Sequence, residues 1–398
     1  MKHDLQKYLQ RYPQICFQRR WNIADDTMYR LGKCEAIVNA LSLTPLSPEV
    51  RSEMLRVSLV KGAMATTAIE GNTLSEAEVM AIQQGESNLP QSRKYLETEV
   101  KNVLDALNKI KDEVVKCGAI VPVSPDLIRS FNEQIGKDLG DSFESVPGVF
   151  RSHEVVVGTY RPPDHLYVKE LISAMCDWLR SEFGFEQNER PSFSRNVIEA
   201  IIAHVYLVWI HPFGDGNGRT ARMLEFYILL RGGFPDICSH ILSNHYNETR
   251  NEYYRQLSNA GKSCDLTKFI EYAVIGLLDG LEGVLDKAQR HLLTACWKNY
   301  AYARMDSEQR ITKPTRKRYI ALLTKLQLFR KYKLSEILTA TPELAAIYAK
   351  SGQRMASRDV KYLTSIGMMV DNESGIMLNS SVLLTNLPQQ RIFARQSK

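Results

Sequence analysis

Residues 211–222 read HPFGDGNGRTAR and join two helical patterns of the chain. Before them, the apolar side chains of 194–210 recur at helical spacing and form a wide face suited to burial. After them, a second helical pattern runs from about Gly218 to Leu230. The run therefore lies at a tight turn between two core helices. Most of the remaining chain also has helical periodicity, and we predict a mainly α protein.

The turn has the features of an anion site. Three glycines recur at every second position: Gly214, Gly216 and Gly218. Glycine allows positive φ and close backbone approach, so successive N–H groups can form a nest for an anion. The positive end of the next helix dipole also favours phosphate. Arg219 and Arg222 share one face of that helix, and their guanidinium groups suit two successive phosphates.

The other polar residues of the run suit a reaction at phosphate. Asp215 would be unfavourable beside bare phosphate, but Mg²⁺ prefers carboxylate and phosphate oxygens together. Asn217 can bond a phosphate oxygen without adding charge. His211 has the pKa range of a general base that acts on a hydroxyl group. The combination predicts in-line attack on a phosphate beside Mg²⁺.

The run resembles the signature of the Fic family, H-x-F-x-D/E-G-N-G-R-x-x-R, and matches every specified position. The resemblance extends over roughly residues 30–275. It implies transfer of AMP from ATP to a Ser, Thr or Tyr hydroxyl of a target protein. His211 would then be the catalytic base, Asp215 the Mg²⁺ ligand and Phe213 a core anchor. The resemblance assigns nucleotide and phosphate contacts to Gly214, Gly216, Asn217, Gly218, Arg219 and Arg222.

Alternatives remain within this resemblance. The related Doc toxins, which phosphorylate, have Ala-Asn-Lys in place of Gly216-Asn217-Gly218, so the sequence favours a nucleotidyl transferase. The motif contacts phosphates and not the base, which leaves UTP, GTP or a phosphocholine donor open. Removal of AMP is also left open.

A second run, TTAIEGN at residues 66–72, closes the helix predicted over 48–70. Thr66 and Glu70 share one helix face, and a carboxylate at a helix C-terminus gains from a cationic partner. On composition alone, Glu70 is an exposed acidic residue. The run resembles the Fic inhibitory motif S/T-x-x-x-E-G/N, with Thr66, Glu70 and Gly71 as its fixed members. The resemblance implies that Glu70 pairs with Arg222, misplaces ATP and inhibits the enzyme.

Two further segments complete the expected site. A β-branched run bounded by Gly and Pro predicts a short hairpin within 146–163. The resemblance identifies part of it with the Fic flap, which holds a target segment by strand addition. These flap residues are Val155, Val156, Val157 and Gly158. Tyr253 and Tyr254 resemble a Tyr-Tyr-x-x-Leu segment of the family that lies near the adenosine.

We expect a domain boundary, or seam, near 285–312. Three helical patterns follow, at 314–329, from Leu334, and at 357–366. A hairpin that turns at 371–375 comes after them. This order is that of a winged helix. We predict four regions: 1–110, helical with the inhibitory motif; 111–285, the Fic core; 286–312, a connecting helix or linker; and 313–398, the winged-helix-like domain. Residues 310–333 are basic, with Arg310 at the start and no acidic residue. A solvated helix face and nucleic-acid contact explain that charge equally well.

Composition sets the broad class. The 398 residues are 44% hydrophobic and 24% charged, as in globular proteins of two or three domains. The sequence has no uncharged apolar run of about 18 residues, so we expect no membrane span. The N-terminus lacks an apolar signal core, so we expect a cytoplasmic protein. Seven scattered cysteines indicate reduced thiols. The net charge of +6 permits DNA as a partner, and a DNA-binding regulator with a nucleotide-sensing core is the alternative function. A homodimer and self-modification are also left open.

Overall fold

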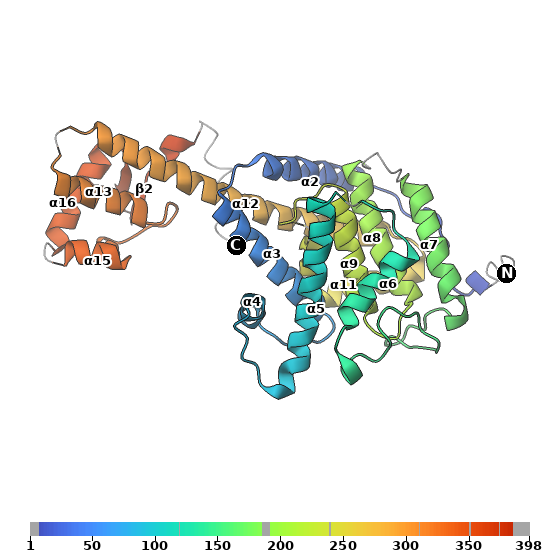
Figure 1. Cartoon of the computed structure of the whole chain (residues 1–398). Helices are drawn as coiled ribbons and strands as arrows, with labels where there is room; N and C mark the ends of the chain where they lie inside the picture. Colours follow the sequence, from blue (N-terminus) through green and yellow to red (C-terminus); the bar gives the residue numbers. More distant parts are fainter. Residues whose placement is uncertain are drawn as a thin grey trace. The chain divides into compact units, whose positions relative to one another are not determined.

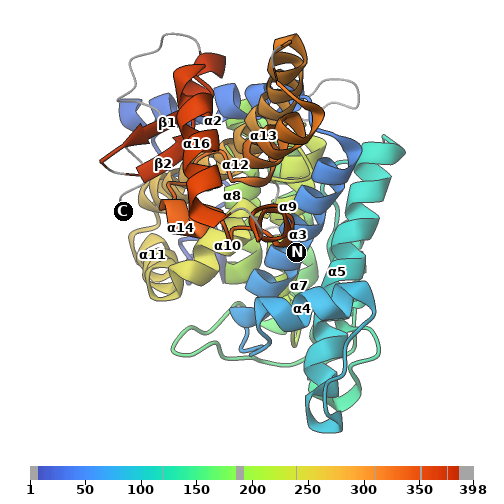
Figure 2. The same ribbon diagram turned by 90° about the vertical axis from the view of Figure 1, so that its left-hand side faces the viewer.

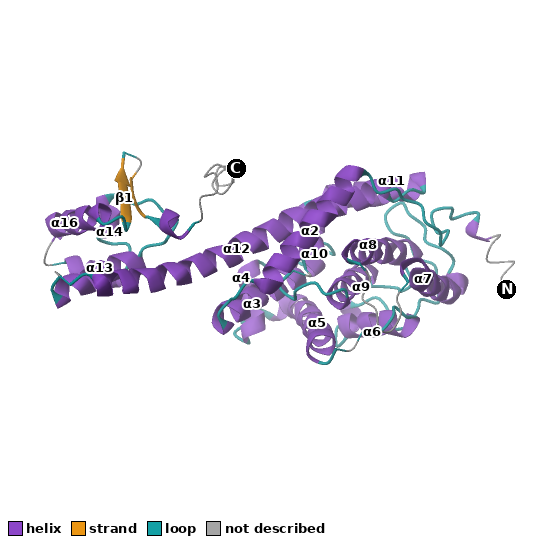
Figure 3. Cartoon of the chain, turned by 90° about the horizontal axis from the view of Figure 1, so that it is seen from above, coloured by secondary structure: helices purple, strands orange, loops and turns teal. Residues whose placement is uncertain are grey.

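The computed structural model describes residues 8–118, 120–184, 192–238, 240–309, 311–349, 352–373 and 375–384. Over these residues the protein is mainly helical, and its strands form one antiparallel hairpin (Figure 3). The predicted fold class is thereby confirmed. The chain divides into two compact units, Met1–Asp286 and Lys287–Lys398. The boundary lies inside one 41-residue helix, α12 (Thr267–Ser307), which occupies most of the expected seam. A further division at residue 110 stays a prediction.

The first unit is a helical bundle. Its helices in chain order are α2 (Asp25–Leu43), α3 (Pro48–Ala68), α4 (Glu76–Gln84), α5 (Lys94–Lys111), α6 (Pro125–Gly136), α7 (Val168–Phe183), α8 (Phe193–Ile210), α9 (Asn217–Arg231), α10 (Ile241–Glu248), α11 (Arg250–Ser263) and the first part of α12. Short turns of helix lie at η1 (Gln91–Arg93), η2 (Asp112–Lys116), η3 (Gly140–Ser142) and η4 (His165–Tyr167). Helices α8 and α9 pack against each other in the interior of the bundle (Figure 1). Helix α3 packs against α5 and α10 (Figure 2).

Helix α8 holds the interior together because it is apolar around most of its circumference. Eleven of its side chains that form the hydrophobic core are Val197, Ile198, Ala200, Ile201, Ile202, Ala203, Val205, Tyr206, Leu207, Trp209 and Ile210. By length and composition alone, α8 is the one described helix that could cross a membrane. Within the unit, 78% of the 18-residue segment Phe193–Ile210 is buried. Core packing therefore explains the apolar character of α8.

Local signals set the helix ends. Ser47 caps α3 through a bond from the Val50 N–H, and Pro48 occupies the first helical position. The predicted capping box before α4 is present, with Ser75 and Glu78 bonding each other's backbone N–H groups. Gly71 follows the end of α3 with φ +105°, a conformation that only glycine adopts readily. These caps place the 66–72 run at the exit of α3, as the sequence predicted.

The hairpin predicted within 146–163 is smaller than expected. Its only described ladder contact is one bridge, in which Val157 and Tyr160 exchange two backbone bonds of 2.9 Å. Pro162 and Pro163 follow after Arg161, and proline cannot donate a ladder hydrogen bond. The flap is therefore a loop with a tight tip, and side-chain contacts hold its two limbs.

The second unit contains the remainder of α12, then α13 (Lys313–Lys325), α14 (Leu334–Ile337), α15 (Pro342–Tyr348), α16 (Gly352–Ser365), β1 (Met369–Asn372), β2 (Gly375–Leu378) and η5 (Ser380–Leu383). Tyr332 adds a single bridge to Ile376 of β2. Strands β1 and β2 pair with Met369 opposite Leu378. The unit has its own apolar core around Trp297.

Three boundaries in this unit differ from the prediction. The helix expected over 314–329 ends at Lys325, and α16 begins at Gly352 rather than near 357. The helix expected from Leu334 is split into α14 and α15, because Thr341 caps a new helix with Pro342 at its first position. Arg310 and Ser374, which the prediction included, lie outside the described residues.

Candidate active site

His211 lies at the C-terminal end of α8 in the left-handed backbone region, with φ +51°. Its Nδ1 lies 3.3 Å from the carbonyl oxygen of Val208. Donation by the Nδ1–H leaves the lone pair on Nε2 available to accept a proton. Burial lowers the pKa of His211 to about 4. The imidazole is therefore neutral at pH 7, which is the form that a general base requires.

The glycines of the turn serve two different purposes. Of the three, Gly216 alone has positive φ, at +76°, and the anion nest itself stays a prediction. Gly214 and Gly218 are needed for space. A side chain at Gly214 would meet the Cβ of Ser145 at 2.8 Å, and one at Gly218 would overlap the Glu70 carboxylate.

Asn217 has a different contact from the one predicted. Its side-chain amide donates to the carbonyl of Phe213 at 2.8 Å and accepts from the Phe213 N–H at 2.9 Å. The residue is buried, and both ends of its amide are used within the turn. Asn217 therefore fixes the shape of the loop here instead of presenting its amide to a phosphate. Phe213 is fully buried against Phe150, as expected of a core anchor.

Glu70 and Arg222 form an ion pair, with Oε1 of Glu70 2.6 Å from Nη2 of Arg222. The same Nη2 donates to the carbonyl oxygen of Thr66 at 2.9 Å. Arg222 is fully buried, whereas 33% of the Glu70 side chain is exposed. Burial opposes ionisation of Glu70, but the field of Arg222 outweighs it and holds the pKa of that carboxyl below its usual value. The carboxylate also lies against Gly218, at the N-terminus of α9, where the helix dipole attracts an anion.

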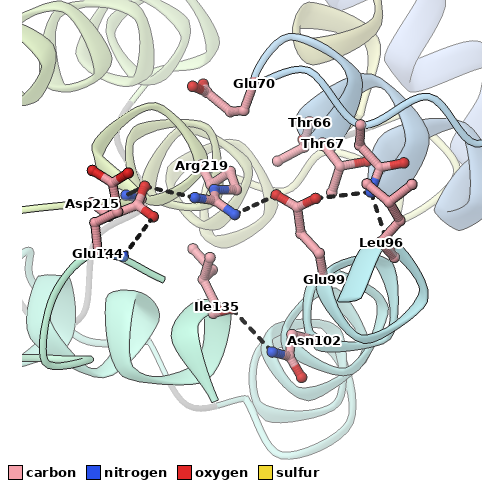
Figure 4. Close-up of polar contacts among 12 residues, drawn as sticks. Thr66, Thr67, Glu70, Leu96, Glu99, Asn102, Ile135, Glu144, Asp215 and Arg219 are labelled. Carbon is pink, nitrogen blue, oxygen red and sulfur yellow. Dashed lines mark hydrogen bonds and ion pairs between the residues drawn. The ribbon is translucent and has the colours of Figure 1, made fainter. Parts of the chain in front are cut away.

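Arg219 lies between two carboxylates (Figure 4). Its Nη2 donates to Oδ1 of Asp215 at 2.8 Å, and its Nη1 donates to Glu99 of α5. The other oxygen of Glu99 accepts from the side chain of Asn72 at 2.8 Å. A chain of bonds thus connects Asn72, the last residue of the 66–72 run, to Asp215, the predicted metal ligand.

Glu99 was missed by the sequence analysis. Burial raises its pKa above the usual range despite the attraction of Arg219. The available signal was an acidic residue on the apolar face of α5, next to Val100 and Val103, which are both fully buried. Nothing in that local pattern indicates that Glu99 pairs with Arg219, 120 residues away in the chain.

Glu99 offers a test of what this chain of bonds contributes. Glu99→Ala should lower the free energy of unfolding by about 2–3 kcal/mol, because Arg219 stays buried with one carboxylate lost. Glu99→Gln should cost less than about 1 kcal/mol, since a neutral amide still accepts a bond and burial already disfavours the charge. Urea unfolding monitored by circular dichroism measures both. Asp105→Ala, on the exposed side of α5, is the control; equal losses in the two Glu99 variants would contradict the role of Arg219.

Asp215 is placed suitably for a metal. It lines a polar cavity of about 390 Å³ together with Glu70, Glu99 and Glu144. Its Oδ2 receives only a long bond, 3.4 Å, from the Glu144 N–H. Carboxylate oxygens that face a polar cavity suit a hard cation such as Mg²⁺.

A cavity of about 550 Å³ brings the other predicted elements together. It is lined by the base His211, by Gly218 and Arg222 of α9, and by Val157 and Gly158 of the flap. Tyr253 and Tyr254 line it from α11. Tyr253 is buried, with its hydroxyl 3.0 Å from Nε2 of His204, whereas Tyr254 is exposed at the rim. Of the remaining predicted flap residues, Val156 is exposed.

Comparisons with known proteins agree with this geometry. The family model described as Fic/DOC family matches residues 122–229. Protein adenylyltransferase fic-1 of Caenorhabditis briggsae is 34% identical over 221 residues, which are 55% of this chain and 40% of that protein. Protein adenylyltransferase Fic of Nematostella vectensis is 30% identical over 207 residues, 52% of this chain and 44% of that protein. The chain thus spans less than half the length of these curated relatives.

Solved structures give the same fold. A Fic family protein from Desulfovibrio desulfuricans aligns over 90% of this chain and 94% of its own, with a TM-score of 0.55 and 19% identity. Fic-1 of Caenorhabditis elegans, residues 134–508, aligns over 64% of this chain and 71% of its own, with a TM-score of 0.52 and 27% identity. The chain therefore has the fold of Fic proteins and contains a Fic/DOC family domain at residues 122–229.

Proposed function

We propose that the protein is a protein adenylyltransferase, which transfers AMP from ATP to a Ser, Thr or Tyr hydroxyl of a target protein. The observation that carries this proposal is the shared cavity. A neutral histidine, the first turn of α9 and the tip of the flap all line it. The curated relatives named protein adenylyltransferase support the same reaction and ATP as the donor.

In the proposed reaction the target hydroxyl oxygen attacks the α-phosphorus of ATP. Nε2 of His211 takes the hydroxyl proton, a phosphoester bond forms, and pyrophosphate leaves. Asp215 would hold Mg²⁺, which neutralises charge on the phosphates when it is bound. The N-terminus of α9 and Arg222 would receive phosphate oxygens, and Tyr254 at the rim would flank the adenosine.

We propose further that Glu70 inhibits this reaction. Its carboxylate lies against Gly218 and is paired with Arg222, so it occupies an anion position at the start of α9. A phosphate group at that position would have to displace it. The same carboxylate beside bound product is also suited to orient a water molecule, so removal of AMP remains an alternative activity of this site.

Mass spectrometry tests the reaction class directly. The Glu70→Gly protein is incubated with ATP and Mg²⁺, alone and with a cell lysate, and its mass is compared with that of the double variant Glu70→Gly, His211→Ala. A gain of one AMP that requires His211 is expected. A gain of phosphate from ATP, or a larger gain in parallel incubations with UTP or GTP, would contradict the proposal.

The second unit supports a separate candidate role, as a winged-helix-like domain that binds DNA. Arg354, Arg358 and Lys361 are exposed on one face of α16, at i, i+4 and i+7. Several cations of the basic stretch 310–333 pair with carboxylates of the same unit. The pairs are Arg316 with Asp306, Arg318 with Asp359, and Lys325 with Glu343.

DNA binding by α16 has a measurable signature. Replacement of Arg354, Arg358 and Lys361 by alanine in the full chain should weaken binding to duplex DNA and reduce the slope of log K against log salt by about 2–3. Fluorescence anisotropy with a labelled duplex at several salt concentrations measures it. Unchanged affinity in the triple variant would leave protein recruitment or a homodimer as the role of this unit. The cytoplasmic location likewise stays a prediction.

A further inference from the structure

The side chain of Arg151 donates hydrogen bonds to three separate backbone carbonyls. Its Nε donates to the carbonyl of His211 at 2.8 Å, its Nη1 donates to the carbonyl of His153 at 3.0 Å, and its Nη2 donates to the carbonyl of Pro163. Its own backbone N–H donates to the carbonyl of Pro212 at 2.9 Å. The residue is buried, with 5% of its surface exposed.

The three carbonyls belong to the two parts of the site that must meet in the reaction. His153 and Pro163 lie on the two limbs of the flap, on either side of its tip at Val157–Tyr160. His211 is the proposed base. A guanidinium group has five N–H donors in a rigid fork, so it can hold three carbonyls in fixed relative positions, which an ammonium group on a flexible stem cannot do.

Both the flap and His211 need such bonds to hold their positions. The flap has a single ladder bridge and so lacks the support that a strand pair would give. His211 has a left-handed backbone, which a residue with a side chain adopts only when its surroundings impose it. Other contacts act alongside Arg151. The Tyr160 hydroxyl donates a bond of 2.8 Å to the carbonyl of Trp209, on the last turn of α8, and Phe150 packs on Phe213.

We propose that Arg151 is a positioning residue of the transfer reaction, which sets the flap at a fixed distance from Nε2 of His211. The proposal rests on the proposed function, in which the flap holds the target backbone. A misplacement of about 1 Å between reacting groups can lower a rate by about 100-fold without any loss of binding. Arg151 should therefore affect turnover and leave nucleotide affinity unchanged.

The test compares Arg151→Lys with the control Arg180→Lys, an exposed arginine of α7 outside the flap, both in the Glu70→Gly protein. Arg151→Lys should lower the rate of AMP transfer at saturating ATP by about 10- to 100-fold, with a change of less than about 2-fold in the dissociation constant for ATP. Hydrogen exchange should accelerate at the amides of residues 152–167 and stay unchanged in α8 and α9. Arg180→Lys should change neither quantity.

Two outcomes would overturn the proposal: transfer within about 2-fold of the parent, or flap exchange equal to that of the parent. If Arg151→Lys fails to fold, as judged by circular dichroism, Arg151→Gln is measured instead, because its amide can keep one of the three bonds. If the Glu70→Gly parent transfers no AMP, the proposed function fails. The exchange measurement still decides whether Arg151 holds the flap.

Discussion

His211→Ala in the Glu70→Gly protein is expected to slow AMP transfer by about 10²- to 10⁴-fold, the range for removal of a general base. The reason is that His211 lines the cavity shared with the flap and the start of α9. Nucleotide affinity should be nearly unchanged, since the phosphate and adenosine contacts come from α9 and α11. Transfer rates from labelled ATP and affinities from calorimetry measure the two quantities. His291→Ala, at an exposed site of α12, is the control.

The pH dependence of the same reaction gives an independent check. Because burial lowers the pKa of His211 to about 4, the base is already neutral at pH 5.5. The rate at saturating ATP should therefore change by less than about 2-fold between pH 7.5 and 5.5, whereas a histidine with the ordinary pKa of about 6.5 would lose about nine-tenths of its neutral form. A rate that falls with an apparent pKa near 6.5 would contradict the assignment of His211 as a buried neutral base.

Glu70→Gly is expected to raise AMP transfer by at least about 10-fold, which corresponds to about 1.4 kcal/mol in the competition for Arg222. The change removes the carboxylate that pairs with Arg222 and lies against Gly218. It should also lower the free energy of unfolding by about 1–3 kcal/mol, because the buried guanidinium loses a charged partner. ATP with Mg²⁺ should recover part of this loss, and thermal unfolding with and without nucleotide measures it.

Glu70→Gln is the matched control for this change. Glutamine keeps the length of the side chain and one hydrogen bond to Arg222, but it removes the negative charge. Intermediate activation is expected, because the guanidinium is held less firmly while the space near Gly218 stays occupied. Labelling of Glu70→Gly no greater than that of the wild type would contradict inhibition by this residue.

Local patterns predicted a large part of this site, and contacts between distant segments account for what was missed. His211, Arg222 and Glu70 belong to short runs whose residue types and spacing carry chemical meaning within one turn or one helix end. Arg151 bonds His211, 60 residues away, and Glu99 bonds Arg219, 120 residues away; nothing in the local sequence indicates these distant partners.

Two details differ from the prediction for a local reason. Asn217 was assigned to phosphate because its amide suits that contact, but the amide is used by the backbone of Phe213 in the turn. The hairpin within 146–163 was predicted from its β-branched residues, yet their pairing is limited to one bridge before two prolines. In both cases the local sequence allowed two uses, and a contact or a proline within the same loop decided between them.

Asn72, two residues after Glu70, is anchored to α5. Its side-chain amide donates to the carboxylate of Glu99 and to the carbonyl of Leu96. The Glu70 carboxylate is therefore a tethered ligand with a fixed effective concentration, and ATP is its diffusing rival for the start of α9. In the proposed mechanism, the apparent dissociation constant for ATP equals the intrinsic constant divided by the fraction of molecules in which Glu70 has left the site. The tether therefore weakens the apparent affinity for ATP and does not block binding completely. The resting activity of the enzyme would then follow the nucleotide level around it, rising gradually as ATP outcompetes a carboxylate that cannot diffuse away.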